Sequence, residues 1–158
     1  MNLPTPSPTP LPTPLSTLLP MKRGLLLFAH GARDPRWAGP FEAVARRVRD
    51  HDPARVVRLA FLEFMLPSLR DAGTALAQAG CTRVDVVPLF LGAGGHVRKD
   101  LPALLEDLSA AWPDVQWRLQ GAIGERDSVI EAMARAAAEV TDEVFAPEKL
   151  ADAPAPAP

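Results

Sequence analysis

The sequence predicts an α/β domain built on a four-stranded parallel sheet with helices on both faces. Apolar residues run without interruption from Leu25 to Ala29, which is typical of a parallel strand buried on both faces. Strand-like runs alternate along the chain with segments of helical periodicity, and right-handed crossovers then place the helices against the sheet. With 158 residues, the chain is long enough for one domain with a core of its own.

Four strand–helix pairs follow one another from residue 21 onward. In the first helix, Phe41, Val44 and Val48 recur three or four residues apart, as on the buried face of a helix. We expect strands over residues 23–30, 56–62, 83–90 and 115–119, and helices over residues 38–51, 67–79, 100–111 and 128–144.

Prolines and a glycine set several of these boundaries. Pro53 follows the first helix and breaks it. Pro67 and Pro102 suit the first turns of the second and third helices, and Gly80 ends the second. Because Pro88 has no N–H to donate to a ladder, we expect it at the end of the third strand.

The two ends of the chain differ in composition from the middle. Residues 1–20 contain seven prolines and no charged side chain, so we expect a disordered, Pro-rich segment there. Residues 146–158 have the composition of a flexible Ala/Pro tail. A single domain is therefore expected over residues 21–145.

Charge and cysteine content exclude several classes of protein. Seventeen basic and nineteen acidic side chains give a net charge of -2, so we expect no nucleic acid as partner. Cys81 is the only cysteine, which excludes an intrachain disulfide and suits a reducing cytoplasm, where we expect the protein. The apolar runs are far shorter than the roughly 20 residues that span a bilayer, so no membrane is expected as partner.

Side chains that bind metal ions follow the first three strands. His30 follows the first strand, Glu63 the second, and His96 the glycine-rich loop after the third. If the first strand lies between the other two, in the flavodoxin-like order, these residues meet at one edge, because neighbouring strands are about 4.8 Å apart. Each alone would more often be a turn or solvated residue, but together they favour an open site for a divalent metal ion. His51 ends the first helix and is expected to be structural.

Glycines and arginines flank the same edge. Gly92, Gly94 and Gly95 permit a flat ligand to approach the backbone closely. Arg33 and Arg98 would form a cationic rim for a polycarboxylate, since a guanidinium pairs with carboxylates through two bonds. A role in solubility alone is the alternative for each arginine. No Lys-Ser or Lys-Thr pair follows the glycines, so we expect no bound nucleotide.

The order of these motifs resembles a known family, the small sirohydrochlorin chelatases of the class II chelatase group. The resemblance covers about residues 22–140, and the chain departs from the family at its Pro-rich ends and at Ala32, where a serine is common. The matching motifs are AHGARDP at residues 29–35, AFLE at 60–63 with PSL at 67–69, and VVPLFL at 86–91 with GHV at 95–97 and DLP at 100–102.

The resemblance implies a chelatase-like fold, a homodimer, and the insertion of Co²⁺ or Fe²⁺ into sirohydrochlorin, a tetrapyrrole polycarboxylate, with release of two protons. It implies that His30 and His96 hold the metal and that Glu63 assists. We favour a cobaltochelatase of cobalamin biosynthesis over a ferrochelatase of sirohaem biosynthesis, and nickel insertion is the least expected, although these ligands do not discriminate between the metals. A carrier of metal or tetrapyrrole without turnover is the alternative. A nucleotide-binding module is a third, for which residues 30–34 make a poor phosphate loop.

Overall fold

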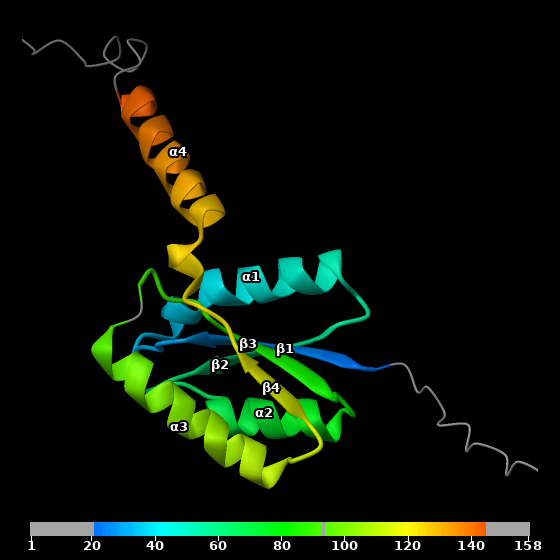
Figure 1. Cartoon of the computed structure of the whole chain (residues 1–158). Coiled ribbons are helices and arrows are strands. Elements are labelled where there is room, and N and C mark those ends of the chain that lie inside the picture. Colours follow the sequence, from blue (N-terminus) through cyan, green and yellow to red (C-terminus); the bar gives the residue numbers. More distant parts are fainter. Residues whose placement is uncertain (1–20, 93, 145–158) are drawn as a thin grey trace, which may run out of the picture.

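The computed structural model describes residues 21–92 and 94–144, and it confirms the predicted α/β fold (Figure 1). The predicted terminal segments, 1–20 and 146–158, lie outside the described residues. The strands are β1 (Arg23–Ala29), β2 (Val56–Phe61), β3 (Arg83–Pro88) and β4 (Gln116–Leu119). The helices are α1 (Ala38–His51), α2 (Leu69–Gln78), α3 (Gly95–Ala111) and α4 (Asp127–Val144), with short 3-10 helices η1 (Pro35–Trp37) and η2 (Ile123–Glu125).

The sheet has the strand order β2-β1-β3-β4, and every pairing in it is parallel. The predicted place of the first strand, between the second and the third, is therefore confirmed. Phe28 of β1 lies opposite Ala60 of β2 on one side and Pro88 of β3 on the other. Pro88 is the last residue of its strand, as its missing N–H predicted.

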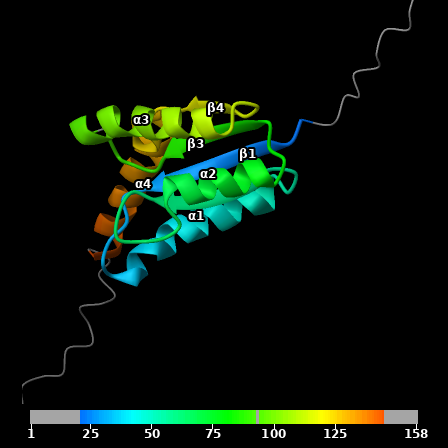
Figure 2. The same cartoon turned by 90° about the horizontal axis from the view of Figure 1, so that it is seen from below.

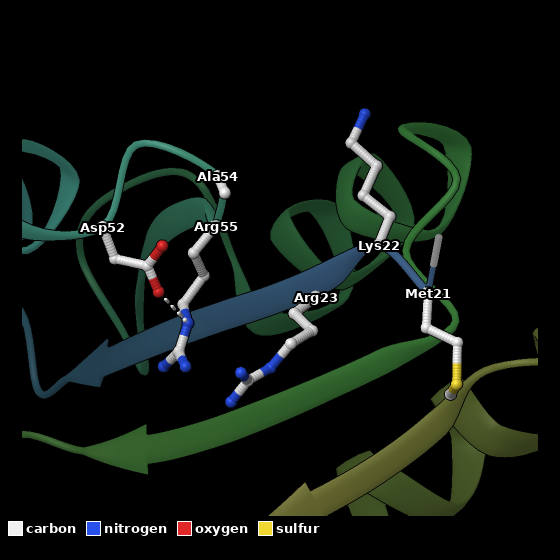
Figure 3. A pocket seen from close by; sticks show the side chains of 6 residues that line it. All are labelled: Met21, Lys22, Arg23, Asp52, Ala54 and Arg55. Carbon is white, nitrogen blue, oxygen red and sulfur yellow. Dashed lines mark ion pairs between the residues drawn. The ribbon is translucent and has the colours of Figure 1, made fainter. Parts of the chain in front are cut away.

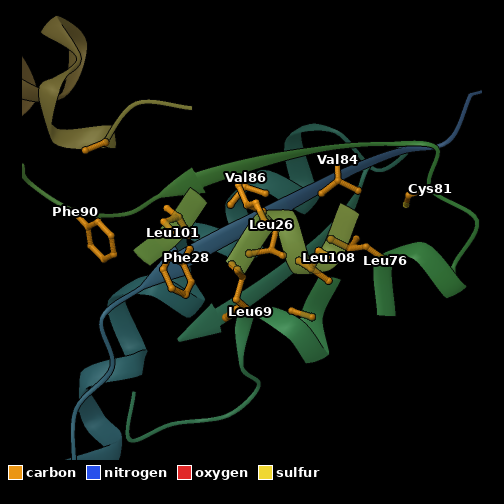
Figure 4. Packing of buried hydrophobic residues seen from close by; sticks show 14 residues of the cluster. Leu26, Phe28, Leu69, Leu76, Cys81, Val84, Val86, Phe90, Leu101 and Leu108 are labelled. Atoms are coloured by element: carbon orange, nitrogen blue, oxygen red, sulfur yellow. The ribbon is translucent and has the colours of Figure 1, made fainter. Parts of the chain in front are cut away.

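Helices cover both faces of the sheet, with α1 on one face and α2 and α3 on the other (Figures 1 and 2). Leu25 and Leu27 of β1 pack with Ala45 of α1. Leu26 and Phe28 point the opposite way, because side chains alternate along a strand, and join the larger cluster under α2 and α3. Figure 4 shows this larger cluster, whose labelled members are Leu26, Phe28, Leu69, Leu76, Cys81, Val84, Val86, Phe90, Leu101 and Leu108.

Helix α2 begins two residues later than predicted, because a capping box at Ser68 fixes its start. The Ser68 hydroxyl accepts a hydrogen bond from the Asp71 N–H, and the Asp71 carboxylate accepts one from the Ser68 N–H. The Ser68 hydroxyl also donates to the carboxylate, and these bonds lower the pKa of Asp71. Pro67 therefore lies just before the cap rather than in the first turn.

Helix α3 begins five residues earlier than predicted, at Gly95 instead of residue 100. Pro102 consequently lies inside the helix, where it cannot donate a hydrogen bond to the carbonyl four residues before it. The predicted start at residue 100 rests on the preference of proline for the first turn of a helix and of glycine for loops. Such preferences of single residues are weak, and the surrounding structure overrides them here.

Helix α4, unlike α1, α2 and α3, does not cover a face of the sheet. It leaves from the carboxyl edge of the strands, extends away from them, and has its main contact with η2 (Figures 1 and 2). On the face of the sheet that α1 covers, Asp85 of β3 lies 3.7 Å from Arg118 of β4 and accepts a hydrogen bond from Gln120. No helix in the described part of the chain is long and apolar enough to cross a bilayer.

Candidate active site

His30 stands at the carboxyl end of β1, exposed to solvent directly after six buried residues. Its imidazole lies against the Phe90 ring, with 4.1 Å between ring centroids and 38° between ring planes. Phe90 is itself buried and meets Phe28 edge-on, at 5.9 Å between centroids. The imidazole therefore rests on the apolar core on one side and is open to solvent on the other.

The backbone holds Glu63 directly opposite His30. Beyond the last residues of β1 and β2, Leu62 N–H donates to the Ala29 carbonyl at 2.9 Å and Glu63 N–H donates to the His30 carbonyl at 3.0 Å. Gly31 follows with a φ of +86°, and a Cβ at this position would collide with the Glu63 carbonyl oxygen. The predicted neighbourhood of His30 and Glu63 is thus built by main-chain bonds, with both side chains exposed.

Arg33 lies over the ring of Phe64, with its guanidinium carbon 5.4 Å from the ring centroid. Phe64 follows Glu63 in the chain, has a φ of 61°, and exposes 59% of its surface. This contact places the Arg33 guanidinium beside the residue that follows Glu63, while the cationic rim of Arg33 and Arg98 stays a prediction.

Arg36, in η1 of the same loop, is tied to Asp34. Its guanidinium donates to both carboxylate oxygens, the shortest bond being 2.7 Å, and these bonds lower the pKa of Asp34 and raise that of Arg36. Trp37 and Phe41 stand beside this pair and help to line an open pocket of about 420 Å³. The pocket is therefore lined by two aromatic rings, Trp37 and Phe41, and by the Asp34–Arg36 ion pair, whose two charges cancel.

The loop between β3 and α3 presents open backbone at this edge. Gly92, Gly94 and Gly95 are exposed, and a Cβ on any of them would meet no atom within 4 Å. His96 and Arg98 lie in the first turn of α3, while their side chains fall outside the described part of the structure. Among the side chains that are described, no three His, Cys, Asp or Glu lie close enough to hold a metal ion. The joint role of His30, Glu63 and His96 therefore stays a prediction.

Several exposed apolar side chains belong to the segments that follow β1, β2 and β3 in the chain. Four of them follow β2 or β3 in the chain, and Trp37 lies in the loop after β1. The exposed fractions are 50% for Trp37, 39% for Leu62, 59% for Phe64, 81% for Leu66 and 72% for Leu91. Exposed apolar side chains on the loops at the carboxyl ends of parallel strands are available to a ligand or to a partner surface.

Phe90 and Phe64 are the functional candidates that the sequence analysis missed. Phe90 follows β3, the neighbour of β1, so the strand order could have placed it next to His30. Phe64 carries no comparable signal, because its contact with Arg33 depends on the left-handed backbone conformation after Glu63.

Replacing Gly31 tests whether the His30–Glu63 arrangement requires this backbone. Gly31→Ala should destabilise the fold by more than about 1 kcal/mol in urea unfolding, because alanine is disfavoured at positive φ and its methyl group meets the Glu63 carbonyl. Gly39→Ala is the matched control: Gly39 lies in the first turn of α1 with open space around it, so alanine there should stabilise. Equal stability of Gly31→Ala and the wild type would contradict this account of the loop.

Curated relatives of this chain carry chelatase names. The chain is 33% identical over 84 residues to the sirohydrochlorin cobaltochelatase of Methanosarcina acetivorans, a match covering 53% of this chain and 65% of that protein. It is 26% identical over 113 residues to the sirohydrochlorin ferrochelatase of Bacillus subtilis, covering 72% of this chain and 43% of that protein. The match thus spans less than two thirds of the length of either relative.

Solved structures share the fold over the same region. A CbiX protein of cobalamin biosynthesis from Marinobacter aquaeolei VT8 is 33% identical, with a TM-score of 0.68, covering 77% of this chain and 98% of that one. The sirohydrochlorin chelatase SirB from Bacillus subtilis subspecies spizizenii, solved with cobalt, is 25% identical, with a TM-score of 0.68, covering 76% of this chain and 51% of that one. The sequence model of the CbiX family matches residues 24–140, nearly all of the described fold, and the chain belongs to that family.

Proposed function

We propose that this chain inserts a divalent metal ion into sirohydrochlorin and releases two protons. The observation that carries the proposal is the exposed His30 imidazole, fixed opposite Glu63 at the carboxyl edge of the sheet. The names of the relatives, which include sirohydrochlorin cobaltochelatase and sirohydrochlorin ferrochelatase, support the choice of substrate.

In the proposed reaction the metal ion is a substrate, held by His30 and His96 until the macrocycle takes it. Neutral imidazole is a ligand of intermediate softness that suits cobalt and iron, and two such ligands leave coordination positions open for the pyrrole nitrogens. Insertion also requires the loss of two pyrrole N–H protons. The Glu63 carboxylate lies at the same edge and is the proposed acceptor of one of them.

The surroundings of His30 suit a flat polycarboxylate. The exposed rings of Phe64 and Trp37 offer apolar area to the face of a macrocycle. Arg33 supplies a guanidinium at the same edge, and we propose that it pairs with a substrate carboxylate together with Arg98. Helix α3 begins here with Gly94 as its N-cap and no capping side chain, so its first N–H groups are available to an anion. Gly92, Gly94 and Gly95 leave room for the ring to approach the loop.

We propose Co²⁺ as the metal, ahead of Fe²⁺. Both metals occur among the relatives, since curated proteins are named for cobalt and for iron insertion and SirB was solved with cobalt. The imidazole and carboxylate groups of the site do not by themselves select either metal, so cellular supply would decide.

We also propose a cytoplasmic location, which the cysteine content supports. Cys81 is the single cysteine; its thiol is buried, and burial raises its pKa.

A metal-insertion assay with purified protein, sirohydrochlorin and Co²⁺ or Fe²⁺ tests the reaction through the change in the absorption spectrum of the macrocycle. His30→Ala and His96→Ala should each lower the rate by about 100-fold or more, and Glu63→Gln should also lower it if the carboxylate accepts a proton. His51→Ala is the control and should insert metal at the wild-type rate. His51 is the last residue of α1 and is not one of the residues at the carboxyl edge.

Two results of this assay would contradict the proposal in different ways. If His30→Ala and His96→Ala both insert metal at the wild-type rate, the assignment of the metal site to these histidines is wrong. Binding of ring and metal by the wild type without insertion faster than in buffer would favour the carrier alternative.

We propose that the active form is a homodimer, and α4 supports this. The helix stands at the carboxyl edge of the sheet, and its side chains are exposed along most of its length (Figures 1 and 2). Val129, Met133 and Val140, spaced four and then seven residues apart, lie on one side of it, and Met133 and Val140 expose 40% and 61% of their surface. A second copy would cover this stripe next to the candidate site.

Light scattering during size-exclusion chromatography tests the dimer. The wild type should elute with twice the mass of the chain, and the double variant Met133→Glu/Val140→Glu should elute as a monomer, because the interface would bury two unpaired charges. Ser128→Glu, on the other side of α4, is the matched control and should remain a dimer. A monomeric wild type, or a dimeric double variant, would rule out an interface at this stripe.

A further inference from the structure

A second concave site lies at the opposite, amino edge of the sheet (Figure 3). This pocket has a volume of about 360 Å³ and is lined by Met21, Lys22, Arg23, Asp52, Ala54 and Arg55. Along β1, Arg23 and His30 are separated by about 20 Å at the usual rise per strand residue. The pocket is therefore remote from the candidate active site, and none of the proposed chemistry uses it.

Three arginines form a row across adjacent strands at this edge. Arg23 begins β1 and lies opposite Arg83, which begins β3, in the parallel register. Gly24 lies opposite Val56, so Arg55, just before β2, falls on the other side of Arg23. Leu25 and Val57 face α1, and side chains alternate along a strand, so Arg23 and Arg55, two positions earlier, face the same way. Arg83 does so too, because it lies opposite Arg23. The three guanidinium groups thus project from neighbouring strands that are about 4.8 Å apart.

The described residues neutralise this arginine row only in part. Arg55 pairs with Asp52 through Nε and Oδ2, which are 3.1 Å apart. Arg23 has no ion pair or hydrogen bond through its side chain among the described residues, and the Nε of Arg83 is buried with no hydrogen-bond partner among them. Asp85, the next acidic group along this face, is held by Arg118 and Gln120.

Lys22 also lines the pocket but is turned away from the arginines in Figure 3. Its ammonium donates a hydrogen bond to the Ala79 carbonyl, at the end of α2, over 2.8 Å. In the same figure the side chains of Arg23 and Arg55 extend in the same general direction, and that of Arg55 lies beside the Asp52 carboxylate. The Asp52 carboxylate thus pairs with Arg55 alone among the three arginines, and a bound anion would relieve the repulsion between the guanidinium groups.

We propose that the arginine row (Arg23, Arg55 and Arg83) binds a small polyanion carrying carboxylate or phosphate groups, at a site separate from the one that inserts metal. Guanidinium groups suit both carboxylate and phosphate, because a planar guanidinium donates two parallel hydrogen bonds to the oxygens of either group. The pocket volume fits a small molecule rather than a macromolecular surface. Arg23 is exposed at the pocket, and Arg55 exposes 22% of its side chain, so both can reach a ligand that enters from solvent.

Isothermal titration calorimetry on the full chain, with citrate in one series and inorganic phosphate in another, tests this site. At least one of the two should bind saturably with a Kd of about 1 mM or tighter, and the series that binds identifies the favoured group. Arg23→Gln should weaken that binding about tenfold or more, and Arg83→Gln should weaken it as well. Arg47→Gln, which removes an exposed arginine of α1 that lines none of these pockets, should leave the affinity unchanged.

The His30→Ala variant separates this site from the proposed metal-insertion site, because it should bind the anion as the wild type does. The proposal is overturned if neither citrate nor phosphate binds saturably. It is also overturned if Arg23→Gln and Arg47→Gln weaken binding equally, which would indicate general charge screening, or if His30→Ala abolishes binding, which would place the anion at the other edge.

Discussion

The parallel pairing of β1 with β2 on one side and β3 on the other is the constraint on which the rest of the molecule depends. It buries β1 on both faces and sets the register that carries Phe28 opposite Ala60 and Pro88. The same pairing continues past the strand ends, where the Glu63 N–H binds the His30 carbonyl. A one-residue slip would turn the apolar side chains of β1 to the wrong faces and would separate His30 from Glu63.

The two edges of this sheet differ in chemistry because each collects the residues that flank the same strands. The carboxyl edge gathers His30, Glu63 and exposed aromatic rings, which suits a flat, apolar and acidic substrate together with a metal ion. The amino edge gathers Arg23, Arg55 and Arg83, which suits a small anion. The apolar, hydrogen-bonded strands between the two edges fix the backbone positions from which each set of groups projects.

The central strands could be predicted from the sequence because burial on both faces requires continuous apolar runs, such as the one from Leu25 to Ala29. The flavodoxin-like order, with the first strand between the second and the third, was the assumption from which the meeting of His30, Glu63 and His96 was predicted, and the structure has that order. The start of α3 could not be predicted from Pro102. A proline is most common in the first turn of a helix, but here the helix tolerates Pro102 in its interior.

The position of α4 was also beyond the sequence, since an apolar stripe indicates that a helix is covered but not by what. Asp85 and Arg118 form an ion pair, and sequence periodicity places both in strands without revealing that they meet. At the candidate site, Phe90 could have been found from the strand order. The contact of Arg33 with Phe64 could not, because it arises from a turn whose conformation no residue type announces.

The central claim is that His30 at the end of β1 and His96 at the start of α3 hold the metal ion at the carboxyl edge. Crystals of the full chain grown with Co²⁺, measured with X-rays at the cobalt absorption edge, test it most directly. The account predicts an anomalous peak about 2.1 Å from an imidazole nitrogen of each histidine, a distance typical of imidazole bound to such ions. A cobalt peak at His51, or at any position that does not include His30, would contradict it.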